Sequence, residues 1–365
     1  MPESNSLQQT KIDTTHFRPL SRAAVVAFSN VLPKLQVFVN DKFLLENKFE
    51  CEDARCEKTG LVHDFNRKFG ELLLGIYEFS LYGILVEEVA WLFAEFESRG
   101  LKRIFIEADL KSWILGINSM IKHPESAELV QPIECMYRYM TAVFEQLGTG
   151  ERPLNEQTRQ FVDFLLQKNR KFAAEYILSL IREGSTIEQV YMQVLLPSLT
   201  HIRLLWRSNK ISAADENVAT DICRYIILRI VDNIFGERKY PFKVLVACVP
   251  DEEDVLGSEV FANFLEIKGW SVDYIGHGFS SEDIITAIVT NKPQVVVLSA
   301  MYIAYLPSAK RLVEQIKQIA PQVKIVMEGR AFRFVKEQFQ PMVDAIVSSF
   351  EEGQKIMLDM VMPRA

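Results

Sequence analysis

Lys243-Val-Leu-Val-Ala-Cys248 begins a series of short apolar segments in the last third of the chain. Further segments of this kind lie at 271–275, 294–299 and 323–327, and a last one is Ala345-Ile-Val347. Helical patterns separate them. Alternation of short β-branched strands with helices predicts a parallel sheet with crossover helices. We therefore expect residues 239–365 to form an α/β domain with a parallel sheet.

The loops that follow these strands predict where a ligand binds, because ligands of doubly wound sheets bind outside the carboxyl ends of the strands. The loops are Asp251–Gly257, Gly276–Phe279, Ser299–Tyr302 and Glu328–Ala331. His277 lies in the second loop, and its imidazole suits a transition metal. His277 is therefore a candidate metal ligand; the alternative is a polar loop histidine without that role.

The same loops resemble the cobalamin-binding domain family, whose signature is Asp-x-His-x-x-Gly, then Ser-x-Leu, then Gly-Gly. Here the corresponding residues are Glu252-Glu-Asp-Val-Leu-Gly257, Ser299-Ala-Met301 and Glu328-Gly329. The resemblance implies a five-stranded, flavodoxin-like (Rossmann-like) sheet that binds cobalamin. It implies these cofactor-binding residues in the sheet domain: Asp254, Gly257, Ser299, Met301 and Gly329. Asp254 stands where the family has the histidine that ligates cobalt from below, and a carboxylate is a poorer cobalt ligand.

A second resemblance lies just before this domain. One branch of the family covers the upper face of the corrin with a helical bundle that carries Trp, nine residues, then Glu-His. Here Trp206 is followed by nine residues and then by Glu216 and Asn217. The resemblance implies that these three residues contact the cofactor, with Asn217 replacing the histidine. That branch contains sensors and photoreceptors, and similar pairs occur in corrinoid methyl carriers.

The remaining chain predicts a division into helical parts. We expect a polar tail at 1–17, an N-terminal helical domain at 18–150, a four-helix cap at 151–238 and the α/β domain at 239–365. Thr186-Ile-Glu-Gln189 has the spacing of a capping box. The expected helices are Leu61–Arg99, Leu101–Lys122, Ser126–Leu147, Asn155–Lys168, Lys171–Glu183, Thr186–Ser208 and Ser212–Phe235.

Composition excludes several classes of protein. The net charge is −7 and no basic block occurs, so we expect no nucleic-acid partner. The 5 cysteines are scattered, which is typical of the reducing cytoplasm. Acidic residues interrupt the apolar stretch Leu72–Ala94, so we expect no membrane span there. The acidic run Asp251–Asp254 lacks calcium-loop spacing, which favours a solvated turn over a cation site.

Three functions remain open. The first is a sensor or regulator, such as a photoreceptor, that binds cobalamin or another tetrapyrrole (haem or a bilin) and signals through a protein partner. The second is a corrinoid methyl carrier, and the third is a scaffold without a cofactor. No Ser/His/Asp set, P-loop or dinucleotide motif accompanies any strand, so nothing in the sequence indicates an enzyme. The N-terminal domain carries no recognisable motif; a partner-binding or dimerisation role, and hence a homo-oligomer, is a hypothesis by elimination.

Overall fold

The computed structural model describes residues 17–46, 57–138, 154–207, 210–232 and 239–362. The chain divides into two compact units, one of residues 1–151 with 207–209 and one of residues 152–206 with 210–365. The expected polar tail at 1–17 lies almost wholly outside the described residues.

The N-terminal unit is a helical bundle. Its described helices are α1 (Arg22–Glu46), α2 (Glu57–Phe79), α3 (Tyr82–Ser98), α4 (Arg103–Met120) and α5 (Glu125–Arg138). The expected single helix Leu61–Arg99 is wrong, because Ser80 adopts a positive φ of 55° and turns the chain between α2 and α3. Helix α5 begins at Glu125, one residue before the expected start at Ser126. Residues 139–147 of that expected helix lie outside the described residues.

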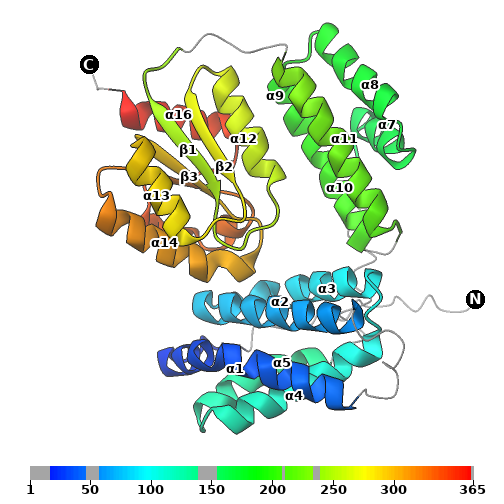
Figure 1. The fold of residues 1–365 in the computed structure, drawn as a ribbon, viewed down its shortest axis with the longest axis vertical. Coiled ribbons are helices and arrows are strands. Elements are labelled where there is room, and N and C mark those ends of the chain that lie inside the picture. Colours follow the sequence, from blue (N-terminus) through cyan, green and yellow to red (C-terminus); the bar gives the residue numbers. More distant parts are fainter. Residues whose placement is uncertain (1–16, 47–56, 139–153, 208–209, 233–238, 363–365) are drawn as a thin grey trace, which may run out of the picture. The chain divides into compact units, whose positions relative to one another are not determined.

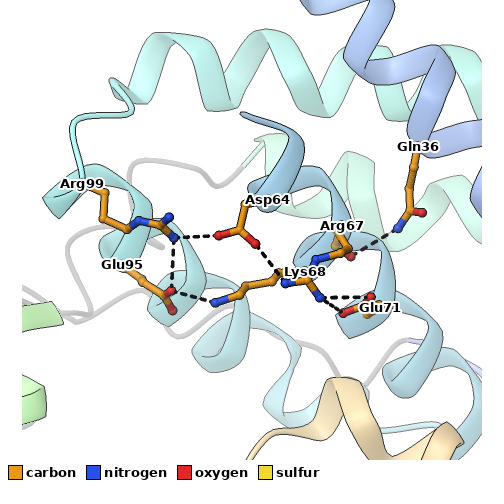
Figure 2. A network of polar contacts seen from close by, with 7 residues as sticks. All are labelled: Gln36, Asp64, Arg67, Lys68, Glu71, Glu95 and Arg99. Carbon is orange, nitrogen blue, oxygen red and sulfur yellow. Dashed lines mark hydrogen bonds and ion pairs between the residues drawn. The ribbon is translucent and has the colours of Figure 1, made fainter. Parts of the chain in front are cut away.

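Helices α2 and α3 are joined by charged side chains (Figure 2). Lys68 on α2 bridges Glu95 on α3 at 3.1 Å, and Asp64 on α2 accepts a hydrogen bond of 2.8 Å from Arg99 just after α3. The Arg99 guanidinium lies 4.7 Å from the ring centroid of Phe96. The pKa of Asp64 is lowered because Arg99, Lys68 and Arg67 outweigh its partial burial. These contacts hold the two helices in register.

Helix α1 is the one described helix that is long and apolar enough to cross a membrane, with a mean hydropathy of 1.3 over part of Arg22–Leu45. In the structure its inward face packs into the bundle through Ala24, Phe28, Leu32 and Leu35, all buried. The stretch Leu72–Ala94, which we considered from the sequence, falls on α2 and α3 instead.

The second unit begins with a helical part, here called the cap (residues 154–232). It contains α7 (Glu156–Leu166), α8 (Arg170–Arg182), a continuous helix from Ile187 to Arg207 and α11 (Ala213–Asp232). The continuous helix comprises α9 (Ile187–Val190), a π-helical turn (Tyr191–Leu195) and α10 (Leu196–Arg207). The expected capping box forms, since Thr186 and Gln189 exchange two side-chain hydrogen bonds with each other's backbone N–H.

The π-helical turn has a physical cause. Pro197 has no N–H to donate to the carbonyl of Gln193, so that carbonyl is released from the helix. It accepts a hydrogen bond of 2.7 Å from Thr158 Oγ1 and one of 3.0 Å from Asn155 Nδ2. Both donors belong to the start of α7. The proline thus fixes α7 against the helix that carries Trp206.

The rest of the unit, here called the cradle (residues 239–362), is the expected doubly wound domain. Its parallel strands are β1 (Lys243–Cys248), β2 (Ser271–Gly276), β3 (Val295–Ser299), β4 (Lys324–Glu328) and β5 (Ala345–Ile346), in the order β2-β1-β3-β4-β5. Helices α12 (Leu256–Ile267) and α16 (Phe350–Val361) pack on one face of the sheet, and α13 (Ser281–Asn291) and α14 (Leu306–Ile319) on the other (Figure 1). The fold prediction is confirmed.

The strand order defines the functional end of the sheet. The chain leaves β1 towards β2 on one side and continues through β3 on the other, so the topological switch lies between β1 and β3. Ligands of such sheets bind in the crevice at that switch. The cap packs on α12, and one hydrophobic core includes residues of both the cap and the cradle.

Candidate functional site

A buried glutamate links the two loops at the switch point. Glu252, in the loop after β1, is 1% exposed. Its Oε2 accepts hydrogen bonds from the backbone N–H groups of Met301 (2.7 Å) and Tyr302 (3.1 Å), which follow β3, and its Oε1 accepts one from Asp254 N–H (2.9 Å). Burial raises the pKa of Glu252 to about 7, although these N–H groups favour the charged form. Glu252 therefore fixes the position of the site loops.

Asp254 makes an ion pair with Arg203, which lies on cap helix α10. The Asp254 side chain is 6% exposed and that of Arg203 is 24% exposed. Burial disfavours the charged guanidinium, but Asp254, with Tyr302 and Glu216, outweighs it and raises the pKa of Arg203 above its ordinary value. Asp254, at the position of the family's cobalt ligand, thus forms an ion pair with a cation of the cap.

The other cap residues lie on the same two helices. Trp206 is half-buried near the end of α10, and its Nε1 is buried with no hydrogen-bond partner among the described residues. Glu216, in the first turn of α11, accepts a hydrogen bond of 3.2 Å from Thr220 and contributes to the charge around Arg203. Asn217 is exposed. Trp206 and Glu216 therefore lie on the helices around Arg203, whereas Asn217 faces solvent.

Two glycines of the signature have different surroundings. A Cβ added to Gly257, at the start of α12, would meet no atom within 4 Å. A Cβ on Gly329 would lie 2.2 Å from the carbonyl oxygen of Ala300, and Gly329 also has a φ of +108°. Gly329 is required by the close approach of β3 and β4, because a side chain would collide with fixed backbone. Gly257 borders open space.

Ser299 and Glu328 end neighbouring strands and are paired in register. Both are buried, and Glu328 Oε1 has no hydrogen-bond partner among the described residues. Burial raises the pKa of Glu328 to about 7; a side-chain hydrogen bond with Ser299 and the charge of Arg333 act to lower it, and Asp254 acts to raise it. Buried polar atoms without partners are uncommon in native proteins and carry an energetic cost.

His277 lies apart from this group in the topology. It is exposed and follows β2, which is an edge strand, whereas the other site loops follow β1, β3 and β4. Met301 contributes its backbone N–H to Glu252. The described residues contain no group of three or more His, Cys, Asp or Glu that could hold a metal ion.

Sequence reasoning missed Glu252, Arg203 and Glu328 as site residues. Glu252 and Glu328 are in the quoted signature, and their acidic character at strand ends was a signal that could have been used. Arg203 had no such signal, because a single arginine on an amphipathic helix is ordinarily a surface residue. Only its contact with Asp254, across 51 residues of sequence, reveals it.

Two family models match the second unit, and both are described as a B12 binding domain. One covers residues 242–357, which is the cradle, and the other residues 158–230, which is the cap. This part of the chain therefore belongs to the cobalamin-binding domain family, as its motifs indicated, and its cofactor is cobalamin. No curated protein matches the chain.

Solved structures with a similar fold include corrinoid proteins. The monomethylamine corrinoid protein of Methanosarcina barkeri aligns with a TM-score of 0.50 and 13% identity, over 56% of this chain and 99% of that one. A cobalamin-binding protein from Desulfitobacterium hafniense DCB-2 aligns with a TM-score of 0.29 and 15% identity, over 56% of this chain and 98% of that one. A methanol:cobalamin methyltransferase complex from Methanosarcina barkeri aligns with a TM-score of 0.31 and 14% identity, over 62% of this chain and 90% of that one. At 13% identity, the likeness to the monomethylamine corrinoid protein concerns the fold alone.

The residues present fit cobalamin in one part of the site and not in another. Open space at Gly257, the close approach at Gly329 and the buried Glu328 Oε1 without a partner fit the floor of a ligand cradle. Asp254 does not fit the role of cobalt ligand, because its carboxylate is paired with Arg203 and is chemically a poor substitute for imidazole. Asp254 would therefore not hold the cobalt of a bound cobalamin.

Proposed function

We propose that the chain is a cobalamin-binding regulatory protein in which the bound corrinoid changes the position of the cap. The observation that carries this proposal is the ion pair between Arg203 of the cap and Asp254 of the cradle. In the family, corrin lies between these two parts, so a corrin ring would separate the two side chains. Ligand binding would then exchange one set of cap contacts for another.

The energetics support a switch. A buried ion pair gains little net free energy over an apolar pair, because removing both charges from water costs nearly as much as their attraction returns. Separating the two charged side chains without replacement would instead leave each without its partner, at a cost of about 3 kcal/mol or more, so the ligand must supply contacts to both. A ligand shifts a conformational equilibrium only by its difference in affinity for the two states, and contacts made with an open cap would supply that difference. The N-terminal unit would pass the change to a protein partner.

A corrinoid methyl carrier is the second candidate, favoured by the overall likeness of the second unit to the monomethylamine corrinoid protein. That likeness concerns fold. The replacement of the cobalt-ligating histidine by an ion-paired aspartate favours the regulatory function. A light-responsive version of the regulator, and a version that binds haem or a bilin, are open to the same experiment.

The test uses the full chain with hydroxocobalamin, methylcobalamin or adenosylcobalamin, in darkness and in light, with haem and a bilin as comparisons. We expect a retained corrinoid spectrum and faster hydrogen exchange in α10 and α11 when the ligand is bound. The variant Asp254→Ala should increase exchange in the same helices without ligand, and Arg159→Ala, which breaks an exposed pair with Glu156 in α7, should not.

Each contrary outcome has a defined meaning. An unchanged spectrum with every tetrapyrrole would favour the scaffold without a cofactor. Binding with unchanged exchange in α10 and α11, together with methyl transfer from bound methylcobalamin to a thiol or amine acceptor, would favour the carrier. Binding that changes exchange only after illumination would identify light as the signal.

A further inference from the structure

Helix α8 of the cap has an exposed aromatic face. Figure 1 shows α8 on the side of the cap that lies away from the cradle. Phe172, in the first turn of α8, is 58% exposed, and its ring stacks on Phe164 of α7 with the ring centroids 6.4 Å apart. Tyr176, one turn further along α8, packs against the same Phe164 ring at 5.6 Å. Three aromatic rings therefore form one cluster at the surface of the cap, and such clusters are typical of contact surfaces.

The charges at the two ends of α8 oppose its helix dipole. The helix begins with Arg170 and Lys171, has no acid in its first turn, and has Glu183 as its C-cap residue. Cations are unfavourable at the amino end of a helix, and anions are unfavourable at its carboxyl end. Arg182, in the last turn, has the favourable sign and lies 3.8 Å from Glu175. Among the described residues neither Lys171 nor Glu183 makes an ion pair, so both charges are open to a partner outside the chain.

The spacing of these residues makes the face of α8 complementary to itself. Phe172, Tyr176 and Glu183 are separated by four and seven residues, which places them along one side of the helix, and Lys171 borders its amino end. A second α8 could lie antiparallel across this side, with a two-fold axis level with Ile177. Lys171 of each copy would then meet Glu183 of the other, and the aromatic rings would lie between these two pairs of charges. Each amino end would also lie beside the carboxyl end of the other copy, where opposite dipole charges attract.

The charge pattern favours a second copy over other occupants. An anionic lipid surface would be repelled by a chain with a net charge of −7, and it would leave Lys171 matched but Glu183 opposed. A partner segment of uniform charge would likewise satisfy only one end of α8. A second copy supplies both charges, each at the position where the first copy needs it.

We propose that the outer face of α8 is an interface between two copies of this chain, packed antiparallel about a two-fold axis. The inference does not rest on the proposed function, because α8 carries none of the residues assigned to the cobalamin site. The helix has 13 residues. Because it is only about 20 Å long, the contact is smaller than a standard protein interface. We therefore expect a dimer that forms reversibly in the micromolar range of concentration.

Sedimentation velocity of the full chain tests the interface, at concentrations from submicromolar to the highest that stays soluble. Lys171→Glu and Glu183→Lys should each weaken the dimer at least about ten-fold, because like charges then face each other. Both changes suit the helix dipole, so neither should unfold α8. A mixture of the two variants should dimerise as well as the unchanged chain, since opposite charges then face each other at both ends of the contact.

A second pair of variants tests the apolar part of the contact. Phe172→Ser removes the exposed ring and should also weaken the dimer at least about ten-fold, because that ring lies between the two pairs of charges. Val289→Ser is the matched control, since Val289 is an apolar residue of α13 in the cradle that is 50% exposed. This control should leave the equilibrium between monomer and dimer unchanged.

A chain that stays monomeric at every concentration overturns the inference. A dimer that survives Lys171→Glu, Glu183→Lys and Phe172→Ser also overturns it, since the two copies would then meet through another face. A mixture of the two charge variants that associates no better than either alone contradicts the antiparallel arrangement. The corrinoid spectrum of the same variants tests the proposed function separately, because loss of the dimer with a retained spectrum, or the reverse, separates the two.

Discussion

Each of the two units buries a carboxylic acid, and the two acids have different surroundings. In the N-terminal unit Asp109 is 3% exposed; its Oδ1 accepts a hydrogen bond of 3.3 Å from Asn66, whose own Oδ1 accepts one of 2.8 Å from Trp113. Among the described residues no cation pairs with Asp109, and burial raises its pKa to about 8. In the cradle, Asp254 is buried against Arg203.

The difference shows two ways to bury an acid. Without a cation, the acid is favoured in its neutral form and becomes part of a packed polar core. With a cation, the acid forms an ion pair, and the pair joins two parts of the chain that are distant in sequence. The first arrangement stabilises the folded protein at pH values below the pKa of the acid. The second makes the contact between cap and cradle depend on what else lies between them.

The largest expected effect is on the dependence of the unfolding free energy on pH, through Asp109. Its folded pKa, about 8, lies above its ordinary value of 3.8, so the folded protein holds a proton that the unfolded chain releases. The stability from this group is complete below about pH 4 and is lost as pH rises towards 8, by about 1.4 kcal/mol per pH unit and about 6 kcal/mol in total. Urea unfolding of Asp109→Asn between pH 5 and 7.5 should show a flatter dependence than the unchanged protein.

Asp64 provides the matched control in the same unit. Its pKa is lowered by Arg99, Lys68 and Arg67, which outweigh its partial burial, so its stability contribution is present above pH 3.8 and is lost as pH falls. Asp64→Asn should therefore leave the pH dependence of the unfolding free energy unchanged between pH 5 and 7.5. Identical slopes for Asp109→Asn and the unchanged protein would show that Asp109 is not the protonated acid.

The next effect concerns Arg203, the cation of the cap that pairs with Asp254. Arg203→Ala should lower the free energy of unfolding by about 3 kcal/mol, because it leaves Asp254 buried without its partner. Arg203→Met combined with Asp254→Leu should recover most of that loss. Arg224→Ala is the control, since its contact with Glu259 is 3.4 Å long and the arginine is 38% exposed; its loss should stay below about 1 kcal/mol. Denaturation by urea, followed by circular dichroism, measures all of them.

The two signature glycines give a smaller and more specific contrast. Gly329→Ala should destabilise the ligand-free protein by about 2 kcal/mol, because its Cβ would collide with the Ala300 carbonyl and its φ is positive. Gly257→Ala should change stability by less than about 1 kcal/mol, because nothing lies within 4 Å of its Cβ. Gly257→Leu should fold and lose cobalamin binding, since its side chain would enter the open space of the cradle. Thermal unfolding and corrinoid titration together test this contrast, and unaltered affinity in Gly257→Leu would contradict it.

The smallest effect is expected at His277. It is exposed at the end of an edge strand, so His277→Ala should leave both stability and the absorption spectrum of bound cobalamin unchanged. A spectral shift in this variant would identify His277 as a cobalt ligand and would show that the site is completed by the loop after β2.

Much of the fold could be predicted because its signals are local. The strands at 243–249 and 294–299 were found from runs of β-branched residues, and the break between helices at Gly100 from a residue that ends helices. The turn at Ser80 was missed, because serine is compatible with a helix and only the packing of α2 against α3 imposes its positive φ of 55°. The π-helical turn before Pro197 was missed for a related reason, since its released carbonyl is stabilised by Thr158 on another helix.

The cradle, the helical cap and the loops of the site could be predicted from the sequence alone. The reason is that periodicity and strand-end motifs involve residues that are close together in the chain. The tertiary structure decided what those loops do. It joined Asp254 to Arg203, joined Glu252 to the backbone after β3, and buried Glu328 beside Ser299 with Oε1 lacking a partner among the described residues. The physical reason is that ion pairing and burial depend on distances between elements far apart in the chain, which local patterns of hydrophobicity do not contain.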